Sequence, residues 1–210
     1  MITAKQVDRF KPLLFVLGLY PLARWFLLGW QGDLTANPTE FLTRSSGIWT
    51  LVCLLVTLSV TPLRDLSGQP ALIRLRRLCG LFTFFYASLH MLAWAWWDQG
   101  FILPAMVEDA VTRTFVCVGL VTFLVLLLLA LTSSQRAMRT LGRGWKRLHR
   151  WIYLAGALSI VHFWLHKAGK NDFAEVTIYG TLMGLLFAWR LWRWLKPETK
   201  KVSASPSGPA

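Results

Sequence analysis

Long apolar runs separated by short polar and basic stretches dominate the pattern of this chain. Six runs lie at about 10–30, 47–64, 78–97, 114–133, 149–166 and 174–195, and Gly, Pro, Asn or charged residues bound each of them. A helix needs about 20 apolar residues to cross the hydrocarbon core of a bilayer, and the runs approach that length. The pattern predicts an all-α membrane protein, a bundle of six transmembrane helices that occupies residues 1–195.

Basic residues alternate between the two ends of the predicted bundle. Eighteen of the 23 Lys and Arg fall before or at the start of the first run, in or beside the second and fourth connections, or near and after the end of the last run. The other end carries Arg24, Arg44, Arg113, Lys167 and Lys170. Because Lys and Arg accumulate in cytoplasmic loops, we expect both termini to be cytoplasmic.

Composition supports the membrane class and narrows the partners. Hydrophobic residues make up 55% of the chain, and the net charge is +13. The basic residues form short clusters between apolar runs, so we expect contact with membrane lipid and no nucleic acid. The first run starts near Phe10 and lacks an A-x-A-like cleavage site, which indicates a retained helix. We expect a multi-pass membrane protein.

Several other kinds of site are excluded by the sequence. The three cysteines lie in different apolar runs and have no paired spacing, which argues against a disulfide framework. No C-x-x-C-H motif is present, so a haem would be bound non-covalently. The loops are too short for a soluble domain, and no G-x-G-x-x-G or P-loop pattern occurs. Residues 196–210 are rich in Pro, Ser and Lys, and we expect a disordered cytoplasmic tail.

Two of the four histidines lie deep inside predicted membrane helices at similar heights. His90 is about 18 Å of helical rise from the start of its run, and His162 is about 20 Å from the start of its own. Both helices run in the same direction. Two neutral imidazoles at matched depth are what bis-histidine ligation of a b-type haem requires. The sequence predicts His90 and His162 as iron ligands.

A third histidine, His149, lies at the cytoplasmic end of the fifth run. The positions that correspond to it on the third helix are Arg76 and Arg77. An arginine does not ligate iron, but it can hold a haem propionate, a flavin phosphate or a quinone headgroup. His149 is thus a third candidate iron ligand without a partner. The sequence leaves open whether the protein binds one haem or two. We expect His166, beside Lys167, to be solvated.

Simpler interpretations stay open at this point. A membrane histidine can serve only to hydrogen-bond a neighbouring helix, and His149 can be solvated at the interface. The arginines near residue 76 are first of all a topology signal. A small transporter with a histidine proton relay is an alternative, although no intramembrane carboxylate or internal repeat is evident. A ferric or other metal reductase and a purely structural anchor are further alternatives.

Four stretches of the sequence resemble one family of membrane proteins. They are PALIRLRRLCGLFTFFYASLH at 70–90, LGRGWKRLHRWIYL at 141–154, IVHFWL at 160–165 and TPL at 61–63. They resemble the MsrQ (YedZ) family, haem-binding membrane subunits of the periplasmic methionine-sulfoxide reductase system within the ferric-reductase-like superfamily. The likeness covers about residues 1–195.

The resemblance implies an electron-transfer subunit rather than a catalytic one. It implies haem b and FMN as cofactors, and the quinone pool or a cytoplasmic flavin reductase as electron donor. The expected acceptor is MsrP, a periplasmic molybdopterin enzyme that repairs oxidised methionines. His90 and His162 match haem-ligand positions and His149 matches a third important histidine. Arg76 stands where related oxidases have a second histidine, which puts a second bis-histidine haem in doubt.

Overall fold

The structure, a computed structural model, describes residues 3–196, and all regular elements in this range are helical. The predicted tail lies outside the described residues except for Lys196. The main helices are α1 (Ala4–Gly18), α2 (Tyr20–Gln31), α3 (Pro38–Ser67), α4 (Arg76–Ala93), α6 (Thr114–Leu131), α9 (Ile152–Ala168) and α10 (Ala174–Leu195). Shorter helices connect them: η1 (Pro70–Leu75), the π-helix η2 (Trp94–Asp98), α5 (Leu103–Thr112), α7 (Gln135–Leu141), α8 (Arg143–Leu148) and η3 (His149–Trp151).

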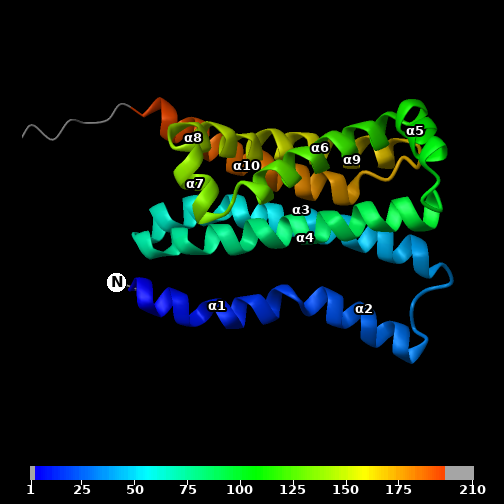
Figure 1. The fold of residues 1–210 in the computed structure, drawn as a ribbon, viewed down its shortest axis with the longest axis horizontal. Helices are drawn as coiled ribbons and strands as arrows, with labels where there is room; N and C mark the ends of the chain where they lie inside the picture. Colours follow the sequence, from blue (N-terminus) through cyan, green and yellow to red (C-terminus); the bar gives the residue numbers. More distant parts are fainter. Residues whose placement is uncertain (1–2, 197–210) are drawn as a thin grey trace, which may run out of the picture.

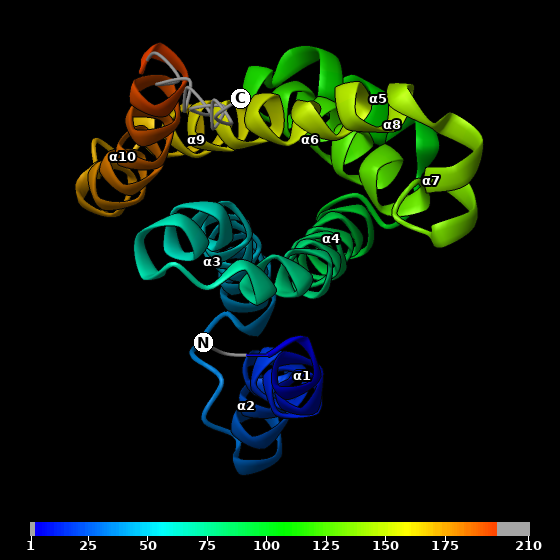
Figure 2. The same cartoon turned by 90° about the vertical axis from the view of Figure 1, so that its left-hand side faces the viewer.

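The long helices lie side by side in three layers (Figures 1 and 2). Helices α1 and α2 form one layer, α3 and α4 the middle layer, and α6, α9 and α10 the third. The start of α1, the end of α10 and the short helices α7 and α8 lie at one end of the bundle, called the basal end here. Helix α5 lies at the opposite end, called the α5 end (Figure 1).

Each of the six predicted segments is helical, but the count of six spans is not confirmed. Within residues 3–196, four stretches are long and apolar enough to cross a membrane: Ala4–Gln31, Pro38–Ser67, Pro70–Asp98 and Thr114–Leu131. Helix α9 has only 17 residues. Helix α10 carries charged side chains within its length, among them Glu175, Arg190 and Arg193. The short helices in the connections were not predicted.

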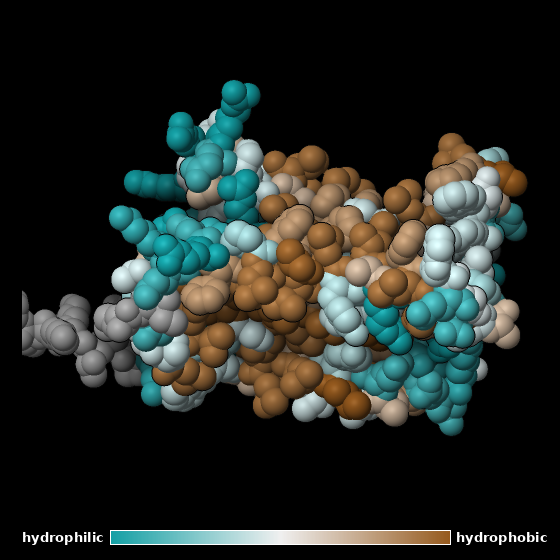
Figure 3. All heavy atoms as spheres, turned by 90° about the horizontal axis from the view of Figure 1, so that it is seen from below, coloured by the Kyte–Doolittle hydropathy of each residue, from teal (hydrophilic) through white to brown (hydrophobic). Residues whose placement is uncertain are grey.

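The outer surface has the polarity of a membrane protein. Figure 3 shows an apolar band across the middle of one face, with hydrophilic side chains gathered toward both ends. Large exposed apolar residues include Leu13, Phe26, Leu124 and Leu185, which come from four different long helices. In water such a surface would drive aggregation, so it is suited to contact with lipid.

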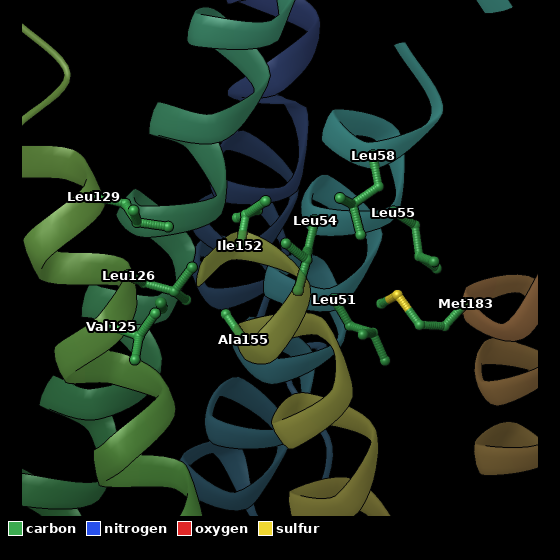
Figure 4. Close-up of a cluster of buried hydrophobic side chains, with 11 residues drawn as sticks. Leu51, Leu54, Leu55, Leu58, Val125, Leu126, Leu129, Ile152, Ala155 and Met183 are labelled. Atoms are coloured by element: carbon green, nitrogen blue, oxygen red, sulfur yellow. The ribbon is translucent and has the colours of Figure 1, made fainter. Parts of the chain in front are cut away.

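The main core lies between the middle and third layers. It consists of Leu51, Leu54, Leu55, Leu58, Ala87, Val125, Leu126, Leu129, Ile152, Ala155 and Met183, most of which are labelled in Figure 4. The side chains of α3, α6, α9 and α10 converge there. Ala155 is fully buried, which allows α9 to approach the neighbouring leucines closely. This packing sets the positions of the helices that carry His90 and His162.

A proline in α3 is compensated by an arginine from α10. Pro62 has no N–H, so the carbonyl group of Leu58, one turn earlier, loses its helical donor. The guanidinium of Arg190 donates to that carbonyl at 2.7 Å and to the hydroxyl of Tyr153 at 2.9 Å. The sequence placed Arg190 among the basic residues of the cytoplasmic side, whereas its side chain is partly buried between three helices.

An aromatic cluster around Tyr86 helps to join the first layer to the middle layer. The ion pair of Asp8 with Arg74 also joins α1 to η1. The helical path breaks between α1 and α2 at Leu19, close to Pro21. The hydroxyl of Tyr86 on α4 donates to the carbonyl of Gly18 at 2.6 Å, and Tyr86 is fully buried. A Cβ at Gly18 would lie 2.5 Å from the ring of Phe82, so only glycine permits this approach.

Candidate functional site

His90 on α4 and His162 on α9 face each other between the middle and third layers. Their ring centroids are 6.0 Å apart, and the ring planes are nearly perpendicular, at 82°. Both rings line a single cavity. The two positions that sequence counting places at matched height are therefore neighbours in space.

Each of these two imidazoles is held by a backbone carbonyl group. The Nδ1 atom of His90 lies 2.8 Å from the oxygen of Thr43, and that of His162 lies 2.7 Å from the oxygen of Phe115. A carbonyl oxygen can only accept, so both Nδ1 atoms carry the proton. The Nε2 atoms are then unprotonated, which is the form that binds a metal.

A glycine packs against each imidazole. A Cβ at Gly47 on α3 would lie 3.1 Å from Cε1 of His90. A Cβ at Gly119 on α6 would lie 2.9 Å from both Cε1 and Nδ1 of His162. Only the absence of a side chain lets the histidine-bearing helices approach α3 and α6 this closely.

The same arrangement thus occurs twice in the chain. In both copies the carbonyl residue lies 47 positions before the histidine, and the glycine lies one turn after the carbonyl residue. The pair α3–α4 corresponds to the pair α6–α9. Sequence reasoning found no internal repeat and missed Gly47, Gly119, Thr43 and Phe115. The spacing from Gly47 to His90 equals that from Gly119 to His162, and this equality was the sequence signal for the repeat.

The cavity has a volume of about 280 Å³ and lies between these two helix pairs. Much of its lining is apolar and includes Ile48, Leu51, Ala87, Met91, Leu120, Phe123 and Leu126. A mostly apolar cavity with a few convergent polar groups is the usual form of a cofactor site.

Charged side chains line the cavity toward the α5 end. Arg44 and Arg113 are exposed, with 43% and 59% of their side-chain surface accessible, so the cavity opens to solvent there. His166 was expected to be solvated, but it is only partly exposed and lines the cavity one turn beyond His162. Lys167 also lines it and is almost fully buried, paired with Asp172 and Glu175.

Asp172 lies outside the helices, in the connection between α9 and α10. The hydrogen bond that Lys167 donates to its carboxylate holds the pKa of Asp172 below its ordinary value. This ion pair links the end of α9 to the connection that leads to α10, at the rim of the cavity.

His149 lies apart from the cavity, at the basal end. Its ring stacks on that of Trp145 with centroids 4.0 Å apart, and its Nε2 lies 3.2 Å from the hydroxyl of Thr132. The indole of Trp145 also donates to the carbonyl of Thr132 at 2.9 Å. The structure therefore does not bring His149 to the other two histidines.

Arg76 and Arg77 begin α4 at the basal end, and Arg77 is exposed. Within residues 3–196 neither side chain makes a hydrogen bond or ion pair with another residue. No cluster of three or more His, Cys, Asp or Glu side chains that could hold a metal ion occurs in this range.

The geometry of the two cavity imidazoles fits a metal ion placed between them. Two metal–nitrogen bonds of about 2 Å would put the ring centroids about 6 Å apart, and the observed separation is 6.0 Å. The fixed tautomers, the apolar lining and the two glycines agree with a planar cofactor held by one nitrogen from each side.

Comparisons with known proteins show which family the chain resembles. The family model described as "ferric reductase like transmembrane component" matches residues 46–160. A Bordetella pertussis protein named protein-methionine-sulfoxide reductase heme-binding subunit MsrQ is 58% identical over 92% of this chain and 94% of its own. Proteins of the same name from Ralstonia nicotianae and Herminiimonas arsenicoxydans are 47% and 43% identical, over 91% and 96% of this chain and 89% and 94% of their own.

No solved structure matches the chain. The similarity to the three relatives nevertheless extends over nearly the whole sequence and includes all the helices that build the cavity. The chain belongs to the MsrQ family of heme-binding subunits, within the ferric-reductase-like transmembrane proteins.

Proposed function

We propose that this protein is a transmembrane b-type cytochrome that carries electrons across a bacterial inner membrane. One haem b would occupy the cavity, held by the Nε2 atoms of His90 and His162. The observation that carries this proposal is the pair of facing imidazoles with fixed tautomers. When bound, the haem accepts and releases one electron at a time. The protein residues set its position and keep water away from its faces.

The six helical segments all span the membrane in this proposal, with both termini in the cytoplasm. The described chain ends lie together at the basal end, as an even number of spans requires (Figure 1). The basal end also carries the basic helices α7 and α8, in agreement with the distribution of Lys and Arg. The α5 end then faces the periplasm.

Electrons enter at the basal end in this proposal. The partly exposed stack of Trp145 and His149 offers an aromatic surface for a donor ring, and Arg76 begins the neighbouring helix. We place the donor there, either a quinone or FMN supplied by a cytoplasmic flavin reductase. His149 is then a donor-site residue and not an iron ligand.

Electrons leave at the α5 end, where the cavity opens. The relatives are named as subunits of protein-methionine-sulfoxide reductase. We therefore propose that this chain reduces a periplasmic molybdopterin partner, MsrP, which repairs oxidised methionines. The chain itself is an electron-transfer subunit and not the catalytic one.

The test is a visible spectrum of the purified protein, reduced minus oxidised, with haem counted per chain. We expect a low-spin b-type spectrum and about one haem per chain. His90→Ala and His162→Ala each remove an imidazole that would hold the haem, so they should lose most of it. The matched variant His149→Ala should keep it. Full haem retention in both cavity variants, or loss only in His149→Ala, would refute the assignment.

A second measurement identifies the acceptor. The reduced protein should transfer electrons to the purified periplasmic reductase with saturation kinetics. Ferric chelates should be reduced slowly and without saturation. The opposite pattern would point to a metal reductase instead.

A further inference from the structure

A buried hydroxyl group without a hydrogen-bond partner lies in the wall of the cavity. The Oγ1 atom of Thr43 is buried, and no described residue pairs with it. Helical threonines usually donate to the carbonyl one turn earlier, as Thr50, Thr57 and Thr122 do here. A buried polar atom without a partner is costly. A rotation of the Thr43 side chain would turn this hydroxyl into the cavity, where a ligand would complete its hydrogen bonding.

Two arginines and a histidine line the cavity at the α5 end, where Thr43 also lies. Arg44 follows Thr43 on α3, and its NH1 makes a long contact of 3.4 Å with the exposed Glu40. Arg113 contacts Asp109 through Nε at 3.0 Å, and 59% of its side-chain surface is accessible. His166 adds a third nitrogen donor to the same wall. A guanidinium group has five N–H donors and suits carboxylates in particular.

The negative groups at this end are partly neutralised already. Glu175 lines the cavity but is paired with Lys167 at 3.1 Å. Asp109 is buried and is bonded by both Arg113 and the indole of Trp94. Asp98 is the remaining carboxylate that lines the cavity. The guanidinium groups of Arg44 and Arg113 thus line a cavity that can still accept an anion.

The cavity therefore has two chemical ends: an apolar body around the imidazoles and a polar, basic rim at the α5 end. A ligand that satisfies both has a planar apolar body with carboxylates along one edge. Haem b has this form, with two propionates on one side of the ring. The rest of the wall, which is mostly apolar, offers no comparable site for these carboxylates.

We propose that Thr43, Arg44, Arg113 and His166 bind the haem propionates and so fix which edge of the ring faces the α5 end. This inference rests on the proposed function, because it assumes that haem occupies the cavity. The propionate edge then lies at the opening through which electrons leave. These residues orient the cofactor and are not iron ligands.

The experiment compares haem b with its dimethyl ester, in which both propionates are neutral. The full-length protein is purified without haem in detergent, and each compound is titrated while the Soret band is recorded. The wild type should bind haem b at least about tenfold more tightly than the ester, because charge-assisted hydrogen bonds are lost in the ester. Both complexes should show the same low-spin bis-histidine spectrum.

Substitutions at the rim should reduce this preference without changing the spectrum. Arg44→Gln and Arg113→Gln should each weaken binding of haem b several-fold and leave the affinity for the ester nearly unchanged. Thr43→Val should act in the same direction, and Thr43→Ser should restore binding. Arg139→Gln, on the exposed helix α7, is the matched control and should behave as the wild type.

The ratio of the two affinities is measured within each variant, so partial loss of folded protein does not alter it. Equal affinity of the wild type for haem b and its ester, with a low-spin spectrum, would overturn the propionate assignment and leave the proposed function intact. An unchanged ratio in all rim variants would do the same. A wild type that binds neither compound would overturn the proposed function together with this inference.

Discussion

Replacing Gly119 by alanine tests directly whether the spacing between α6 and α9 is set for His162. The new Cβ would lie 2.9 Å from Nδ1 and Cε1 of the imidazole, well inside the roughly 3.5–4.0 Å of a favourable contact. The ring must then move by several tenths of an ångström. Its hydrogen bond to the carbonyl of Phe115, now 2.7 Å, would lengthen or break.

The expected free-energy cost of Gly119→Ala follows from three contributions. Overpacking costs about 1–3 kcal/mol, and the weakened hydrogen bond costs about 0.5–1.5 kcal/mol. The higher helix propensity of alanine offsets about 1 kcal/mol. A net destabilisation of about 0.5–3.5 kcal/mol remains. Haem affinity should fall about 10–100-fold, the usual effect of disturbing a group that orients a metal ligand.

The assay measures haem content per chain and thermal unfolding of the same preparations. Gly184→Ala on α10 is the matched control, because a Cβ there would meet no atom within 4 Å. That variant should keep its haem and be at least as stable as the wild type. Gly47→Ala should show a milder loss, since its closest contact to His90 is 3.1 Å. Full haem content and an unchanged spectrum in Gly119→Ala would refute the reasoning.

Two further predictions concern a contact between the first and middle layers and an ion pair at the end of α9. Tyr86→Phe removes the hydroxyl that binds the carbonyl of Gly18 at 2.6 Å, so it should lower the free energy of unfolding by about 1 kcal/mol. Tyr20→Phe, at an exposed position, should not lower it. Equal melting temperatures of the two variants would contradict this prediction. The lowered pKa of Asp172 means that its pair with Lys167 stabilises the fold above the ordinary Asp value of 3.8 and is lost as pH falls through the folded-state value. Asp172→Asn should therefore be less stable than the wild type at pH 7 and equal to it in strong acid, as measured by thermal unfolding at both pH values; a difference that does not depend on pH would reject the pair.

Much of the helical pattern was predictable because it depends on local composition. The apolar runs predicted where the long helices lie, and the rise per residue predicted similar heights for His90 and His162. Neither observation predicts the rotation of a helix about its axis. The contacts of His90 with Gly47 and of His162 with Gly119 depend on that rotation, so they were not found from the sequence.

Side chains that cross between helices were also missed. Arg190 belongs to a basic cluster in the sequence, and the sequence shows no reason for it to turn inward. In the structure Arg190 turns inward because the carbonyl group of Leu58, on α3, has lost its helical donor to Pro62. The sequence predicts a solvated His166 because the charged Lys167 follows it. In the structure Lys167 itself is buried and paired with two carboxylates. Long-range pairing of this kind is visible only in three dimensions.

The cavity between the pairs α3–α4 and α6–α9 makes folding and cofactor supply interdependent. A ligand held by one imidazole from each pair binds the assembled bundle and not the separated pairs, so each bound molecule shifts the folding equilibrium toward the native state. At a free concentration of 100 times Kd the shift is about 2.7 kcal/mol, a large part of the stability of a typical domain. Cofactor shortage would thus raise the fraction of unfolded chains, and the proteases that remove such chains would match the amount of protein to the amount of cofactor.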